Sequence, residues 1–250
     1  MQTLNIAAYH FVAISNPASL ADNLRAQAQE LELKGTILVA PEGLNLFLAG
    51  AKEAIERFLH SVQADQRFCS MRIKRSWSEH VPFRRLKVRV EAEIITFDPS
   101  INPAGLNTPT VSPATLKRWL DKGQDDQGQA LVLLDTRNEE EVALGSFESA
   151  INPQIRKFTE LPAAVESLRS SLEGKTVVAF CTGGIRCEKA VPWLNQNGVP
   201  HAYQLEGGIL GYFEAVGGAH WKGQCFVFDE RVALDPLLKA TVDAPAQGRV

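Results

Sequence analysis

The chain has 250 residues, of which 45% are hydrophobic and 22% charged, and its formal net charge is -3. This composition is typical of a globular protein, and the slight acidity argues against a surface that binds nucleic acid everywhere. Because we find neither an apolar run long enough to span a bilayer nor a leader at Met1, we expect a cytoplasmic protein with no membrane partner.

The cysteines are too few and too widely spread for a disulfide framework, as expected of a reducing compartment: Cys69, Cys181, Cys187 and Cys225. None of the five histidines has a second His or Cys at metal-ligand spacing, so we expect no metal site. The sequence also lacks a flavin, nicotinamide, haem or iron signature, and no cofactor is identified from it.

The first hundred residues alternate between strand and helix patterns. Strands are predicted over residues 3–14, 36–40 and 44–49, and helices from Pro17 to about Lys34 and from Ala51 to about Ala64. With the extended sequence that follows, the order is β-α-β-β-α-β. This order predicts a ferredoxin-like α+β domain over residues 1–98.

Basic residues concentrate in that extended sequence. Between residues 67 and 90 there are eight Lys and Arg against Glu79 alone, an excess of seven positive charges. Such asymmetry points to a polyanion partner bound on one basic edge or face of the sheet. The strict alternation of apolar and basic residues is also that of a strand with one face in water, and taken alone this simpler explanation has slightly more weight.

The remainder of the chain is predicted as a linker over residues 99–113, an α/β domain over 114–220 and an extension over 221–250 that is disordered after about 243. Strands and helices alternate with short connections in the α/β domain. This pattern predicts a parallel sheet flanked by helices. The strand at 131–135 ends in Asp135 and the strand at 176–180 leads into Cys181, so both residues are expected at the same edge of the sheet.

A strand, tight loop and helix are predicted around the second cysteine, in the stretch Phe180-Cys181-Thr182-Gly183-Gly184-Ile185-Arg186-Cys187-Glu188. Such a loop directs backbone N–H groups and a helix N-terminus at the sulfur of Cys181, and Arg186 adds a positive charge. All three favour the thiolate and lower its pKa. The alternative is a buried structural cysteine, but packing requires neither the paired glycines nor the arginine.

Several motifs resemble the rhodanese family. Asp135-Thr136-Arg137, Glu141, Gly145 and Ala150 are similar to its D-x-R-x-x-x-E-x-x-x-G-x-x-x-x-A pattern, and residues 181–186 resemble its active-site loop. With Ile37–Asn45 and Cys225–Val232, the likeness extends to the tRNA uridine(34) hydroxylases of the TrhO type. The resemblance implies an acylphosphatase-like domain followed by a rhodanese domain. Many members continue into a cysteine-rich tail, whereas this sequence has no cysteine after Cys225.

The resemblance implies hydroxylation of the wobble uridine to 5-hydroxyuridine, with molecular oxygen as co-substrate and the anticodon region of tRNA, not DNA, as partner. Cys181 is the expected nucleophile, and Thr182 to Arg186 donate to an outer sulfur or an anion. We expect Asp135 and Arg137 to stabilise the strand ends beside the site. The predicted tRNA-phosphate contacts are Lys74, Arg75, Arg84, Arg85 and Lys87.

Three alternatives bear on the loop. A phosphatase of the C-x5-R kind needs arginine at position 187, which is Cys187, so the shorter loop argues against it. A sulfurtransferase that carries a persulfide on Cys181 is the main competing function, and an RNA-binding module with an inert rhodanese-like domain is the non-enzymatic one. Two roles are possible for Cys187. It can pack as a small apolar residue, which we favour, or it can resolve an oxidised Cys181.

Overall fold

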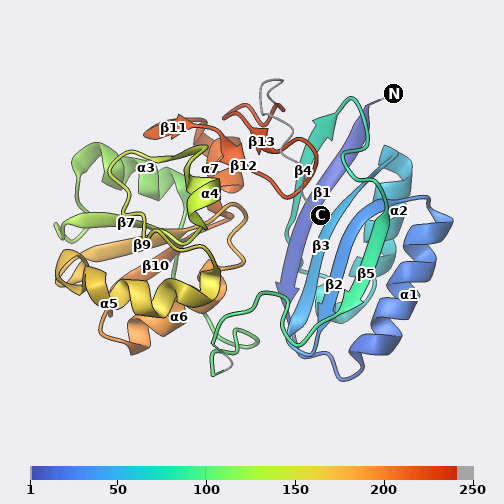
Figure 1. The fold of residues 1–250 in the computed structure, drawn as a ribbon, viewed down its shortest axis with the longest axis horizontal. Helices are drawn as coiled ribbons and strands as arrows, with labels where there is room; N and C mark the ends of the chain where they lie inside the picture. The colour runs from blue at the N-terminus through green and yellow to red at the C-terminus, as the bar shows by residue number, and fades with distance from the viewer. Residues whose placement is uncertain (1, 99, 241–250) are drawn as a thin grey trace. The chain divides into compact units, whose positions relative to one another are not determined.

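The computed structural model describes residues 2–98 and 100–240, and the chain divides into two compact units (Figure 1). Unit 1 consists of the residues up to Ile95 together with Phe228–Arg231, and unit 2 of Thr96–Val227 and the residues from Val232 onward. The disorder predicted after about residue 243 falls outside the described residues.

Unit 1 is a five-stranded sheet with two helices on one side, as Figure 1 shows. Its elements are β1 (Thr3–Phe11), α1 (Pro17–Glu30), β2 (Lys34–Ala40), β3 (Gly43–Gly50), α2 (Lys52–Gln63), the short 3-10 helix η1 (Gln66–Phe68), β4 (Ile73–Ser78) and β5 (Leu86–Val90). The strand order β4-β1-β3-β2 is that of a ferredoxin-like domain, to which β5 adds a fifth strand parallel to β2. The predicted fold class is confirmed for this part of the chain.

Alternation along the strands assigns side chains to two faces of this sheet, one covered by the helices and one, here called the open face, opposite the helices. Ile6, Ile37 and Leu46 belong to the core between the sheet and the helices, and Phe58 of α2 packs into the same cluster. Helix α1 begins where the sequence predicts, because the Asn16 side chain accepts a hydrogen bond from Ser19 N at 3.0 Å and Pro17 follows it. It ends at Glu30, four residues before the predicted end.

The two basic strands lie at opposite edges of the sheet: β4 pairs with β1, and β5 pairs with β2. The two basic strands therefore do not share one edge, and of the predicted edge or face only a shared face is compatible with this strand order. Alternation along a strand specifies which face a side chain takes, but strand order depends on how the chain crosses the sheet, and two consecutive strands need not be neighbours.

A short segment from late in the chain completes unit 1. The ring of Phe228 lies 5.9 Å from that of Phe47 between centroids, and Arg231 donates to Ser76 Oγ at 2.7 Å. Glu230 accepts from Arg84 at 2.9 Å and donates its backbone N–H to Pro82 O at 3.0 Å. Residues 228–231 thus bond to the sheet and to the loop between β4 and β5.

Unit 2 has a four-stranded, wholly parallel sheet in the order β6-β10-β9-β7. Its elements are β6 (Thr110–Val111), α3 (Pro113–Lys122), β7 (Leu131–Asp135), α4 (Glu139–Val142), β8 (Gly145–Phe147), η2 (Phe158–Glu160), α5 (Leu161–Leu172), β9 (Thr176–Phe180), α6 (Cys187–Gln196), β10 (Ala202–Leu205), α7 (Gly208–Val216), β11 (Trp221–Gly223), β12 (Cys225–Phe226) and β13 (Ala233–Leu234). Figure 1 shows α5 and α6 on one side of the sheet and α3 and α7 on the other. The predicted parallel sheet with flanking helices is confirmed.

The stretch predicted as linker contains the first strand of this sheet. Thr110 and Val111 pair with Gln204 and Leu205 of β10, and Val111 is buried in the core of unit 2. A strand of two residues has no recognisable period, so the sequence around its prolines gave no sign of it. Ser112 then accepts from Thr115 N at 3.2 Å and caps α3.

Among residues 2–98 and 100–240, none of the helices combines the length and the apolar character that crossing a bilayer requires.

Candidate functional site

The loop between β9 and α6 encloses the sulfur of Cys181. Gly184 donates its backbone N–H to Cys181 Sγ at 3.1 Å, and the N–H of Arg186 also bonds to this sulfur. Gly184 has a φ of +104°, a conformation that residues with a side chain rarely adopt. Thr182 instead donates its hydroxyl to Phe226 O at 3.3 Å. Of the predicted loop donors, the structure therefore directs those of Gly184 and Arg186 at the sulfur.

Opposing influences set the pKa of Cys181. Complete burial raises the pKa, because a thiolate loses its hydration. A hydrogen bond from the Cys187 thiol, the charge of Arg186 and the N–H groups of Arg186 and Gly184 together outweigh burial and lower the pKa from 9.0 to about 6. The loop therefore favours the thiolate of Cys181 relative to that of an ordinary cysteine.

The start of α7 supports the same loop from the side of β10. Ile209 N donates to Cys181 O at 3.0 Å, and Leu210 N donates to Thr182 O at 3.1 Å. This approach requires glycine at position 208, because a Cβ there would lie 2.5 Å from Cys181 O. Helix α7 thus holds the backbone of Cys181 and Thr182 in place. In the sequence, Gly207-Gly208 after β10 signals a close contact, but it does not show which residues the glycines approach.

A buried ion pair holds the arginine of the loop. Arg186 Nη2 lies 2.8 Å from Glu141 Oε2, and the two side chains are 7% and 4% exposed. Glu141 also accepts from Asn138 N at 3.1 Å through the same oxygen. Sequence analysis quoted Glu141 as part of a motif and assigned it no role, since its partner is 45 residues away in the chain.

Asp135 and Arg137 form a second ion pair, whose side chains are both fully buried, with Nη2 and Oδ2 2.6 Å apart. Register places Asp135 level with Phe180, so the ends of β7 and β9 meet at one edge of the sheet. Arg137 Nη2 also donates to Gly145 O at 2.7 Å, and Ser146 Oγ donates to Asp135 Oδ2 at 2.8 Å. These bonds from the ion pair connect β8 to the end of β7.

Cys187, the first residue of α6, lies against both the loop and β7. It is fully buried and is hydrogen-bonded to Cys181. Its Sγ lies 3.7 Å from Thr136 Oγ1. Burial first, and then the bond to Cys181 and its charge, raise the pKa of Cys187 well above the ordinary value. Cys187 therefore packs inward, as predicted, and also contacts the reactive sulfur.

The five predicted tRNA contacts are divided between the edges of unit 1. Lys74 and Arg75 are in β4, Lys87 is in β5, and Arg84 and Arg85 precede β5. Arg75 pairs with Ile6 in the register, which places it on the helix-covered face, where it bonds to Glu56 of α2 at 3.2 Å. By the same argument, Lys74 and Lys87 both belong to the open face.

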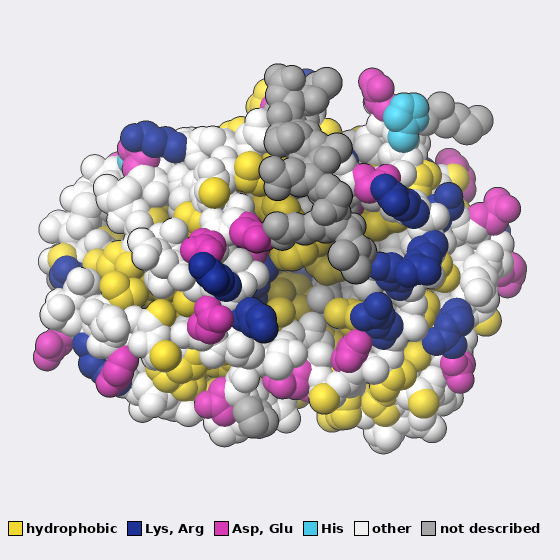
Figure 2. Space-filling view, in the orientation of Figure 1, with side chains coloured by type: hydrophobic (Ala, Val, Ile, Leu, Met, Phe, Trp, Pro, Cys, Tyr) yellow, Lys and Arg dark blue, Asp and Glu magenta, His cyan; other side chains and the backbone are white. Residues whose placement is uncertain are grey.

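A row of paired positions crosses this open face: Lys74, Ala7, Phe47, Thr36 and Lys87. Arg89, which sequence analysis did not select, pairs with Leu38 and belongs to the same face. Figure 2 shows Lys and Arg side chains gathered over β5. The accessible positive charge of this face therefore lies on the side of β5, because Lys74 Nζ is buried and the ring of Phe47 packs against Phe228.

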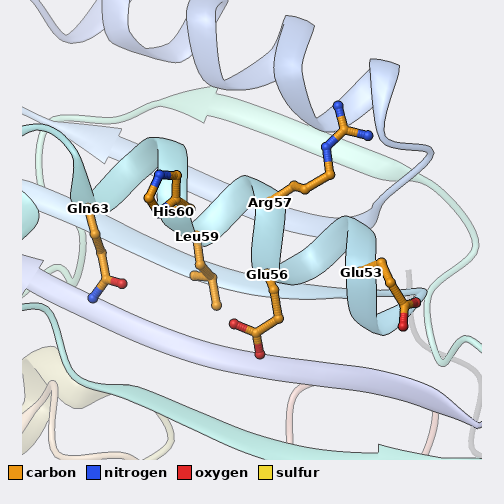
Figure 3. Close-up of a pocket in the computed structure, with 6 residues that line it drawn as sticks. All are labelled: Glu53, Glu56, Arg57, Leu59, His60 and Gln63. Atoms are coloured by element: carbon orange, nitrogen blue, oxygen red, sulfur yellow. The ribbon is translucent and has the colours of Figure 1, made fainter.

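A surface hollow of about 600 Å³ lies along α2 (Figure 3), lined by Glu53, Glu56, Arg57, Leu59, His60 and Gln63. It lies on unit 1, and the loop of Cys181 contributes nothing to its lining. Within the described ranges, no group of three His, Cys, Asp or Glu side chains is placed to hold a metal ion.

Comparison with known proteins places both units in families. Residues 3–94 match the family described as UPF0176 acylphosphatase like domain, and residues 112–215 match the rhodanese-like domain. A protein of Xanthomonas euvesicatoria named tRNA uridine(34) hydroxylase is 58% identical over 96% of this chain and 98% of its own. Proteins of the same name from Bordetella petrii and Variovorax paradoxus are 56% and 54% identical, each over 98% of this chain and over 97% and 94% of their own.

These matches cover both units at high identity, and the shared name agrees with the hydroxylase interpretation and not with the sulfurtransferase alternative. The chain belongs to the tRNA uridine(34) hydroxylase family.

Proposed function

We propose that this protein hydroxylates C5 of the wobble uridine of tRNA in the cytoplasm, with molecular oxygen as co-substrate and the Cys181 thiolate as the reacting group. The family supplies the reaction and the tRNA substrate. The observation that carries the role of Cys181 is its sulfur, held by two backbone N–H groups and the charge of Arg186, with a pKa of about 6. A cysteine that served only in packing would gain nothing from these donors.

Unit 1 is the proposed tRNA-binding part. The basic residues of β5 and of the loop before it give a positive surface that attracts phosphates over a distance of about 10 Å. Arg85 and Arg89 are exposed, and Lys87 lies between them at the start of β5, so this edge of the sheet is where we place the tRNA phosphates.

The direct test is to delete the gene and analyse nucleosides of bulk tRNA by mass spectrometry. We expect 5-hydroxyuridine and the nucleosides made from it to disappear, and to return with the wild-type gene. Unchanged levels in the deletion strain, in an organism without a second enzyme for this step, would rule the proposed function out.

Reversing two charges beside β5 should weaken tRNA binding. In Arg85→Glu with Lys87→Glu, two phosphate contacts become repulsive, so we expect affinity at low salt to fall by at least about 10-fold. The slope of log affinity against log salt concentration should also flatten by roughly 1 to 2, because fewer counterions are released. Arg84 is left intact in this variant because it already pairs with Glu230.

The matched control is Lys52→Glu with Arg57→Glu, which changes the net charge equally on α2, on the other face of unit 1. Binding isotherms over a salt series compare the two variants. Equal losses in both would mean that net charge matters and position does not, which would contradict the placement of tRNA on β5.

A further inference from the structure

The backbone of one residue, Gly184, bonds to both Cys181 and Cys187. Gly184 donates its N–H to Cys181 Sγ at 3.1 Å and accepts Cys187 N–H on its carbonyl oxygen at 3.0 Å. The loop therefore folds back on itself, and the two side chains become hydrogen-bonded to each other while both are buried. Two thiols in direct contact are placed for a disulfide, whereas cysteines whose side chains diverge are not.

The two sulfurs differ in protonation: Cys187 carries the proton, and Cys181 is favoured as the thiolate. Thr136 donates its hydroxyl to Phe180 O at 3.0 Å, and the same oxygen lies 3.7 Å from Cys187 Sγ. Cys187 keeps its proton while Cys181 loses its own, because the two pKa values move apart. The pair is thus a thiolate beside a thiol, the arrangement from which dithiols are oxidised.

We propose that Cys181 and Cys187 are oxidised together to a disulfide in each hydroxylation and so deliver the two electrons that the reaction consumes. This inference rests on the proposed function. Insertion of one oxygen atom of O2 into the C5–H bond of uridine leaves the second atom to be reduced to water, which needs two electrons and two protons. One dithiol supplies both: uridine, O2 and the two thiols give 5-hydroxyuridine, water and the disulfide. A cellular thiol reductant then restores the pair.

The other two cysteines are not placed for this role. The described bonds of Cys225 run to Phe226 O, 3.6 Å from its Sγ, and to Thr182. Cys69 is exposed and belongs to unit 1. The electron-donating pair is therefore confined to the loop and the first turn of α6.

The test is a single turnover in air. Fully reduced protein is freed of reductant, mixed with tRNA that lacks the modification, and quenched with N-ethylmaleimide. Trypsin cleaves after Arg186, between the two cysteines, so a disulfide leaves the peptides of residues 176–186 and 187–189 joined. We expect about one 5-hydroxyuridine per chain, an equal amount of joined peptide, and no joined peptide when tRNA is omitted.

Cys187→Ser should make almost no product without reductant and recover part of its rate when a small dithiol is added, a rescue that a purely structural loss would not show. Cys69→Ser is the matched control and should behave as wild type. Product formed while both thiols remain free overturns the dithiol proposal and leaves the hydroxylase assignment intact. Failure of the wild-type protein to form product even with excess dithiol overturns both.

Discussion

Cys181→Ser is expected to lower the rate of 5-hydroxyuridine formation by at least about 100-fold and to leave the fold intact. A serine hydroxyl fits the same space and can accept from Gly184 N–H and Arg186 N–H. It stays protonated at every pH at which the protein is folded, so the donors of the loop have no anion to stabilise. The measurement is kcat/KM on unmodified tRNA, with Cys69→Ser as control, and retained activity in Cys181→Ser would show that the loop is scaffold only.

The pH dependence of the wild-type protein follows from the same sulfur. Because the pKa of Cys181 is lowered to about 6, the thiolate is present above that pH and is lost as the pH falls through it. Activity should therefore decline below pH 6, and the thiolate absorbance in the ultraviolet, taken as the difference from Cys181→Ser, should titrate there. A midpoint near that of an ordinary cysteine would contradict the lowering of this pKa by the Cys187 thiol, the charge of Arg186 and the loop N–H groups.

Arg137→Ala is expected to destabilise unit 2 by about 3 to 5 kcal/mol, because it leaves the Asp135 carboxylate buried without its counter-charge. Gly145 O also loses a donor in this variant. The double variant Asp135→Asn with Arg137→Met should lose less stability than the single one, since it removes both charges together. Urea unfolding followed by tryptophan fluorescence suits this test, because the Trp221 ring centroid lies 5.4 Å from the Arg137 guanidinium carbon.

Arg84→Ala is the matched control for that experiment. It breaks an ion pair of similar length, with Glu230, but the Arg84 side chain is 92% exposed, and we expect a cost below about 1 kcal/mol. Similar losses of stability in Arg84→Ala and Arg137→Ala would mean that burial does not decide the strength of the Asp135–Arg137 ion pair.

The features that the sequence predicted well are local ones. The run from Thr176 to Phe180, the glycines after Cys181 and the start of α6 lie within about twenty residues, and each follows from hydrophobic period or backbone freedom. The bond between Arg186 and Glu141 and the contact of Cys187 with Thr136 join segments 45 and 51 residues apart. Such partners depend on how the sheet is ordered, which periodicity does not encode.

Strand order also decides where the basic residues lie. Lys74 and Lys87 were predicted on one surface, and register does place both on the open face of the sheet, but from strands at opposite edges. Arg75, one position after Lys74, turns to the other face and bonds to Glu56. Basic residues that are close in the sequence therefore lie on different edges of the sheet, and one of them lies on its other face.

The segment Phe228–Arg231 has a consequence for biosynthesis. Ser76 of β4 is bonded to Arg231, which follows 155 residues later, and Phe47 has Phe228 as its partner. When the ribosome has completed β5, unit 1 still lacks this segment, and it acquires the segment only after nearly the whole of unit 2 has been synthesised. The unit that begins the chain is thus among the last to be completed, and until then the aromatic ring on its open face lacks the cover of Phe228 during translation.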